Sequence, residues 1–182
     1  MPLRRSGRTV IEQYPELPAC WAPYDVRFPL IAGQVASLVR DRMPNVTVEH
    51  IGSTAVPGCG GKGVIDVMVV SSPEFLERVK DLLAELGFQP QTTRDAFPES
   101  RPMRVGALRH QGQLFRIHAH VLTAGAPEVG RLLAFRNRLR ADSALRASYE
   151  ACKKAILAAS TSDSVSYAEA KARFFEGVGA TR

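Results

Sequence analysis

The stretch that decides the fold is EHIGSTAVPG at residues 49–58, together with VIDVMVV at residues 64–70. Alternating apolar and polar residues predict a strand over 46–51, and a nearly continuous apolar run predicts a second strand, buried on both faces, over 64–70. A single acid, Asp66, interrupts this second run. Because a buried carboxylate is costly unless it binds a metal, a cation or several donors, Asp66 is a candidate site residue.

A glycine-rich loop over residues 52–63 joins the two predicted strands. Glycines allow backbone N–H groups to turn toward an anion, Ser53 adds a hydroxyl donor, and Lys62 adds a cation. The loop is not a Walker A phosphate loop, because Val56 stands five residues before Gly61 and Gly63 follows the lysine. It is not a dinucleotide-binding fingerprint either, since a strand rather than a helix is predicted after it. The loop therefore indicates an anion site of another kind.

The second candidate constellation is the sequence RIHAHV at residues 116–121. Strand alternation places Arg116, His118 and His120 on one face, with apolar residues on the other. Two imidazoles on one strand face can ligate a metal or contact phosphate, and a hydrogen-bonded structural role for each remains open. His50, on the first predicted strand, falls on the face opposite Glu49.

Outward from these segments, the pattern predicts a helix from about Pro29 that ends before Pro44, and a helix capped by Ser72 that ends at Gly87. Strands are expected over 103–110 and 114–122 around a turn at 111–113, and a surface loop over 89–102. Helices are expected over 127–140, 143–160 and 166–177. This order predicts an α+β fold, with an irregular lead-in over 1–22 and a single domain over 23–178.

Composition narrows the class of protein. The chain has 182 residues, is 45% hydrophobic and 23% charged, and carries 24 Lys and Arg against 18 Asp and Glu, a net charge of +6. These values exclude disordered, collagen-like and coiled-coil proteins, and no apolar run approaches the roughly 20 residues of a membrane span. Cys20, Cys59 and Cys152 form no CxxC pair, which excludes a disulfide framework or zinc ribbon. We expect a cytoplasmic protein without membrane association.

Several separate motifs together resemble the GrpB family, also called UPF0157, over about residues 23–176. They are Tyr24-Asp25, Arg27-Phe28-Pro29, the stretch 49–58, Lys62, Ile65-Asp66-Val67, His118-Ala119-His120-Val121, Leu133-Ala134-Phe135-Arg136 and Tyr167-x-x-Ala170-Lys171. The resemblance implies a nucleotidyltransferase-like fold, a small mixed β-sheet flanked by helices with a helical C-terminal part. In that superfamily, a Gly-Ser turn grips nucleotide phosphates, and two acids one residue apart bind magnesium.

On this chain, Gly52 and Ser53 match the phosphate-gripping turn and Asp66 matches the first acid. The second acid position holds Met68, which cannot ligate Mg²⁺ as a carboxylate does, and this argues against standard two-metal nucleotidyl transfer. Asp66, Glu49 and the two histidines could build a different metal site. Imidazole ligands favour Zn²⁺ or Mn²⁺ over Mg²⁺, so the expected cofactor is a divalent metal drawn from these three.

We therefore expect a transferase acting on a nucleotide or other phosphate-bearing small molecule. Its catalytic residues would be Asp66, His118 and His120, and its metal ligands these three with Glu49. Its phosphate-binding residues would be Gly52, Ser53, Thr54, Lys62, Arg116, Arg136 and Lys171.

Two alternatives stay open: a non-catalytic nucleotide- or anion-binding domain of the same fold, and a nucleic-acid-binding protein. An aromatic content of 7% offers no stacking platform for the last. The oligomeric state and acceptor are not indicated.

Overall fold

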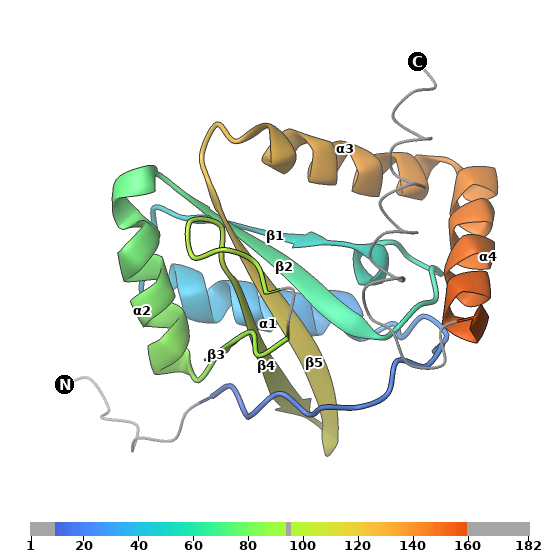
Figure 1. Ribbon diagram of the computed structural model, residues 1–182, viewed down its shortest axis with the longest axis horizontal. Coiled ribbons are helices and arrows are strands. Elements are labelled where there is room, and N and C mark those ends of the chain that lie inside the picture. Colours follow the sequence, from blue (N-terminus) through green and yellow to red (C-terminus); the bar gives the residue numbers. More distant parts are fainter. Residues whose placement is uncertain (1–9, 94–95, 160–182) are drawn as a thin grey trace.

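Five strands form one mixed sheet in the order β1-β2-β5-β4-β3 (Figure 1). The computed structural model describes residues 10–93 and 96–159. The strands are β1 (Thr47–Ile51), β2 (Val64–Ser71), β3 (Gln89–Pro90), β4 (Met103–His110) and β5 (Gln113–Thr123). The helices are α1 (Phe28–Arg40), α2 (Leu76–Leu86), α3 (Pro127–Ala141) and α4 (Ser143–Ala159), with 3₁₀ turns η1 (Ser53–Ala55) and η2 (Pro73–Phe75). The predicted α+β class, a small mixed sheet flanked by helices, is confirmed.

The pairing of β2 with β5 positions the candidate site. These strands run parallel, with Asp66 beside His118 and Met68 beside His120. Strand β1 pairs antiparallel with the other edge of β2 and places Glu49 beside Met68. Because directly paired residues point to the same face of a sheet, all five of these side chains share one face.

Strands β4 and β5 form an antiparallel hairpin, as predicted. His110 pairs with Gln113, so Gln111 and Gly112 alone form the turn, with φ values of 48° and 80°. Positive φ at both central residues is the signature of a type I′ turn, whose twist matches that of the flanking strands. The hairpin sets the register that carries His118 and His120.

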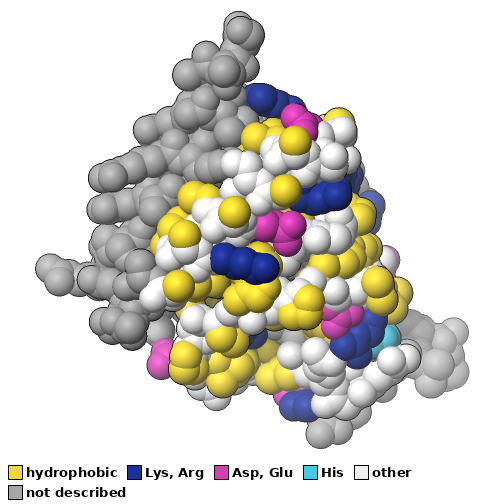
Figure 2. Space-filling view, turned by 90° about the vertical axis from the view of Figure 1, so that its right-hand side faces the viewer, with side chains coloured by type: hydrophobic (Ala, Val, Ile, Leu, Met, Phe, Trp, Pro, Cys, Tyr) yellow, Lys and Arg dark blue, Asp and Glu magenta, His cyan; other side chains and the backbone are white. Residues whose placement is uncertain are grey.

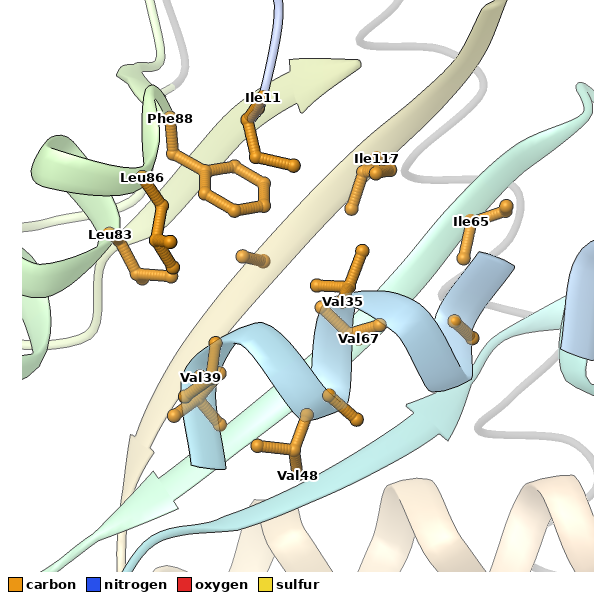
Figure 3. Packing of buried hydrophobic residues seen from close by; sticks show 14 of the residues in the cluster. Ile11, Val35, Val39, Val48, Ile65, Val67, Leu83, Leu86, Phe88 and Ile117 are labelled. Atoms are coloured by element: carbon orange, nitrogen blue, oxygen red, sulfur yellow. The ribbon is translucent and has the colours of Figure 1, made fainter. Parts of the chain in front are cut away.

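Two hydrophobic layers cover the sheet. On one face, α1 and α2 pack over the main core, part of which is drawn in Figure 3. On the other face, Leu132 and Leu133 of α3 pack against Ile51, Met68 and Leu122. The candidate site therefore lies on the α3 face, away from the main core.

The described part of the segment that precedes α1, residues 10–27, is irregular but is held against the sheet. Ile11 is 1% exposed and belongs to the main core, where it packs near Phe88 (Figure 3). Glu12 and Ala107 exchange two backbone hydrogen bonds of 2.7 and 3.0 Å. The sequence did not predict this packing, because the prolines of the segment indicate irregular structure and no periodic pattern marks Ile11 as buried.

One detail differs from the predictions, and one prediction is not tested. Ser72 makes no side-chain cap, since the first turn after it is the 3₁₀ turn η2, closed by the Phe75 N–H to the Ser72 carbonyl at 3.0 Å. The predicted helix over 166–177, which includes Lys171, lies outside the described residues. Over the described ranges, no helix is long and apolar enough to cross a membrane.

Candidate metal centre

Asp66, His118 and His120 converge on one face of the sheet. Oδ1 of Asp66 lies 3.5 Å from Nδ1 of His118 and 3.2 Å from Nε2 of His120. The three side chains are 20%, 25% and 14% exposed, so the group is partly covered yet open to solvent. The structure thus brings together the three residues predicted to be catalytic.

The charge state of the group suits metal binding. Burial alone would raise the pKa of the Asp66 carboxyl, but the hydrogen bonds and charges of the two histidines outweigh it and hold that pKa well below its usual range. Burial lowers the pKa of His120, although Asp66 opposes the shift. Metal ligation uses an ionised carboxylate and a neutral imidazole, and both pKa shifts are in the direction of these forms.

The spacing of the donor atoms also fits a metal. One ligand atom from each residue lies within 4.8 Å of the others. Bonds of 2.0–2.1 Å to a tetrahedral ion place neighbouring donor atoms about 3.3 Å apart, close to the two distances to Asp66. Three protein ligands leave the fourth position of such an ion for water or substrate.

Gly52 brings the backbone directly against the Asp66 carboxylate. Its φ is 72°, and a β-carbon at this position would lie 2.5 Å from Oδ2 of Asp66. Glycine is therefore required twice, by backbone conformation and by space. The predicted phosphate-gripping turn lies beside the candidate metal centre.

Two N–H groups of the glycine-rich loop beyond this turn are bonded within the chain. The Gly60 N–H donates to Oε1 of Glu150 at 2.7 Å, and the Gly61 N–H donates to the Ala22 carbonyl at 2.9 Å. A β-carbon at Gly60 would lie 2.3 Å from the Trp21 ring. Glycine is needed here because the chain packs closely against the segment before α1.

The buried side chain of Lys153, in α4, contacts this loop. It is 2% exposed, and its Nζ donates to the Gly60 carbonyl and lies 3.5 Å from Sγ of Cys59 and 4.3 Å from the centroid of the Tyr149 ring. A β-carbon at Gly61 would lie 3.0 Å from Oγ of Ser53 and 3.1 Å from this Nζ. Ser53, predicted to bind phosphate, therefore lies near a buried ammonium group.

Lys62 and Arg116 lie at the ends of β2 and β5 nearest the loop. Nη2 of Arg116 donates to the Lys62 carbonyl at 2.6 Å. Both residues line a groove of about 620 Å³ whose other walls include Tyr24 and Phe115. Arg116 precedes His118 by two residues on the same strand face, so β5 contributes to both the groove and the candidate metal centre, although Asp66, His118 and His120 do not line the groove.

Glu49 and Arg136 pair with each other. Nη1 of Arg136 lies 2.8 Å from Oε2 of Glu49 and donates to the His50 carbonyl at 2.9 Å. Glu49 is not in the group of donor atoms around Asp66. The neighbouring Arg140 donates to the Ala55 carbonyl at 2.9 and 2.7 Å, so Arg136 ties α3 to β1 and Arg140 ties it to η1.

Thr54 lies with His50, on the opposite face of β1 from Glu49. Its Oγ1 is 3.0 Å from Nε2 of His50, and its side chain is almost fully buried. Burial lowers the pKa of His50 to about 4, although the charge of Asp66 opposes the shift. His50 and Thr54 therefore share a hydrogen bond in which the imidazole is neutral, on the face of β1 that α1 covers.

Three site neighbours were not predicted. Oη of Tyr14 lies 3.1 Å from Nε2 of His118, and the Phe97 ring centroid lies 5.8 Å from that of His120. The Arg101 guanidinium stacks over Phe97 and pairs with Glu128. Burial raises the pKa of the Tyr14 hydroxyl. These residues come from segments predicted as irregular, where no periodic pattern signals which side chains turn inward.

Among the described residues on the face that carries α4, basic side chains do not gather into one patch. Figure 2 shows dark blue and magenta side chains scattered among hydrophobic ones. Counterion release requires several cations along one surface, so this face gives no support to a nucleic-acid interface.

Comparison with known proteins relates the chain to one family. A family model described as GrpB protein matches residues 20–180. A UPF0157 protein of Halalkalibacterium halodurans is 31% identical over 159 residues, 85% of this chain and 77% of that protein. A UPF0157 protein of Streptomyces coelicolor is 35% identical over 128 residues, which are 70% of this chain but less than two thirds, 63%, of that protein.

Solved structures are similar as well. The conserved protein GrpB from Enterococcus faecalis has a TM-score of 0.64 and 22% identity, and the match covers 88% of this chain and 99% of that one. The poly(U) polymerase Cid1 has a TM-score of 0.48 and 11% identity over 70% of this chain and 40% of its own. The first similarity shows a shared fold, and the family model spans nearly all of the sequence motifs quoted above. The chain belongs to the GrpB family.

Proposed function

We propose that Asp66, His118 and His120 bind one divalent metal ion, and that the protein is a transferase acting on a nucleotide or another phosphate-bearing small molecule. The convergence of a carboxylate and two imidazoles on one partly exposed sheet face carries the proposal. This donor set suits Zn²⁺ or Mn²⁺ better than Mg²⁺, because imidazole is a softer ligand than carboxylate or water. When bound, the ion would supply Lewis-acid polarisation of a phosphoryl oxygen.

The position of Gly52 links phosphate binding to metal binding. A phosphate held at the Gly52–Ser53 turn would lie beside the ionised Asp66 carboxylate, which repels it. A cation on Asp66 would reverse that local charge. Substrate phosphate is therefore expected to bind only after the metal, with Ser53 and Arg116 orienting it.

A second candidate function is binding without transfer. Met68 occupies the second acid position, is 0% exposed and packs with Ile51 and Leu122. No carboxylate at that position can hold a second ion, and the two-metal clamp that stabilises attacking and leaving oxygens is missing. This observation favours a nucleotide- or anion-binding domain that keeps a single metal.

Thermal unfolding of the full chain with Zn²⁺, Mn²⁺ or Mg²⁺ tests metal binding. We expect Zn²⁺ and Mn²⁺ to raise the Tm, since a ligand at 100 times its Kd stabilises the folded state by about 2.7 kcal/mol. The Asp66→Asn variant should lose this response, and Asp81→Asn, an exposed carboxylate of α2, should retain it. An equal response in both variants would place the ion elsewhere.

Addition of nucleoside triphosphates then separates the two candidate functions. We expect a further Tm increase that requires the metal, and release of pyrophosphate in the presence of an acceptor marks a transferase. Metal-dependent binding without pyrophosphate release supports the binding domain. No response to any nucleotide or metal would contradict both candidates.

A further inference from the structure

Tyr14 contacts the candidate metal centre from a segment that precedes residues 20–180, the part of the chain matched to the family. Its Oη lies 3.1 Å from Nε2 of His118, and the two ring centroids are 5.4 Å apart with the planes tilted by 32°. The opposite ring nitrogen, Nδ1, faces Asp66 at 3.5 Å. The imidazole of His118 is thus held on both sides, by a hydroxyl and by a carboxylate.

The backbone around Tyr14 is fixed by contacts that do not involve the site. The Tyr14 N–H donates to Oε1 of Gln89 at 2.9 Å. Three residues earlier, Ile11 is buried against Gly106, where a β-carbon would lie 2.3 Å from its Cγ2. Glu12 adds the bridge to Ala107. The hydroxyl of Tyr14 is therefore presented to His118 by a segment anchored along the edge of the sheet.

We infer that Tyr14 is a positioning residue of the metal centre, which orients His118 so that Nδ1 is available as a ligand; this inference rests on the proposed function. A metal-bound histidine commonly donates its other ring N–H to an outer partner, which fixes the tautomer and the ring orientation. With Nδ1 bound to the ion, Nε2 carries the proton and donates it to Oη of Tyr14.

A hydroxyl suits this position because it can either donate or accept the hydrogen bond with Nε2 of His118. In the tautomer with the proton on Nδ1, the N–H faces Asp66 and the Tyr14 O–H donates to Nε2. With an ion on Nδ1, the ring proton would sit on Nε2 and donate a hydrogen bond to the same oxygen, whose own O–H would turn away, since a phenol is both donor and acceptor. One hydrogen bond between His118 and Tyr14 is kept in both arrangements.

The inference is tested by measuring Zn²⁺ affinity in wild type and Tyr14→Phe, with competition by a chelator of known affinity. The phenyl ring keeps the packing against His118, so only the hydroxyl is lost. We expect Kd to rise about 10- to 100-fold, the usual effect of removing an outer-shell partner. Tyr24→Phe, whose ring packs edge-on against Phe28 at 5.6 Å, is the matched control and should stay within twofold of wild type.

A spectroscopic readout separates orientation from a general structural effect. The ¹⁵N resonance of Nε2 of His118 should shift in metal-free Tyr14→Phe, because its hydrogen bond is gone, and the Co²⁺ absorption bands of the loaded variant should change. Unchanged Zn²⁺ affinity with an unchanged ¹⁵N resonance would overturn the inference. Absence of metal binding in wild type would instead contradict the proposed function, and the ¹⁵N comparison would still test the contact.

Discussion

At Gly52 the backbone has a φ of 72°, and a β-carbon there would lie 2.5 Å from Oδ2 of Asp66. Gly58 shares the positive φ, at 77°, but a β-carbon there would meet nothing within 4 Å. A substitution at Gly58 therefore carries only the cost of backbone conformation, whereas a substitution at Gly52 must also displace the carboxylate.

We predict that Gly58→Ala lowers the free energy of unfolding by roughly 1–2 kcal/mol. Gly52→Ala should lower it by more, because its φ of 72° and ψ of −171° lie in a region open essentially to glycine alone and its β-carbon would meet the carboxylate. Only Gly52→Ala should also weaken Zn²⁺ binding, by at least about tenfold, because it moves one of the three ligands. Urea unfolding and Zn²⁺ titration measure the two effects. Equal Zn²⁺ affinities in the two variants would show that Gly52 does not set the position of Asp66.

His50 provides a pH-dependent prediction. Its pKa in the folded state is about 4, chiefly because of burial, against an ordinary value of about 6.5. Between these values the unfolded chain binds more protons, so His50 should lower the free energy of unfolding as the pH falls from 6.5 toward 4, and should have no effect above that window. The slope from one group is at most about 1.4 kcal/mol per pH unit.

Urea unfolding at several pH values, in wild type and His50→Gln, checks this expectation. Glutamine can keep a hydrogen bond to Oγ1 of Thr54 but does not titrate. The variant should therefore lose stability less steeply below pH 6.5. Parallel curves for the two proteins would mean that His50 is not buried as neutral imidazole.

At the scale of elements, the β4–β5 hairpin and the β2–β5 pairing together define the site. The hairpin turn fixes β5 relative to β4, and the parallel register then sets Asp66 beside His118. A slip of one residue would turn His118 and His120 to the opposite face. The conformation of the turn residues therefore helps to set the positions of His118 and His120, although the turn does not contact them.

Gln111 is the one described residue other than glycine with a positive φ, at 48°. Asparagine adopts this conformation more readily, and Asn-Gly is the preferred pair for a type I′ turn. We predict that Gln111→Asn raises the free energy of unfolding by about 0.5–1 kcal/mol. Thermal unfolding measures the change, and a lower Tm would show that the Gln111 side chain makes a contact that outweighs its backbone strain.

For the whole molecule, the segment before α1 is part of the cooperative fold. Ile11 is 1% exposed in the main core, while its neighbour Val10 is 44% exposed. We predict that Ile11→Ala lowers the free energy of unfolding by about 2–5 kcal/mol, and that Val10→Ala changes it by less than about 0.5 kcal/mol. Equal effects in urea unfolding would mean that the segment packs loosely against the sheet.

Much of the fold could be predicted from residues 49–70 and the hairpin, because hydrophobic periodicity and turn residues act locally. The strand over 103–110 was predicted to the residue, and the acid in β2 was recognised by its cost of burial. Less of the site could be predicted. Glu49 was expected beside Asp66, but its carboxylate pairs with Arg136, which lies 87 positions away on α3.

By itself, the sequence determined most of the described helices and strands, the family and the two segments that carry the site, while β3 fell within the predicted surface loop. Only the tertiary structure decided which side chains meet. His120 and Asp66 are 54 positions apart, and Tyr14 and His118 are 104 apart. Local propensity fixes how each strand alternates but not its offset against a neighbour, which depends on turn geometry and on the packing of both sheet faces. The side chains that surround Asp66 are therefore a property of the assembled sheet.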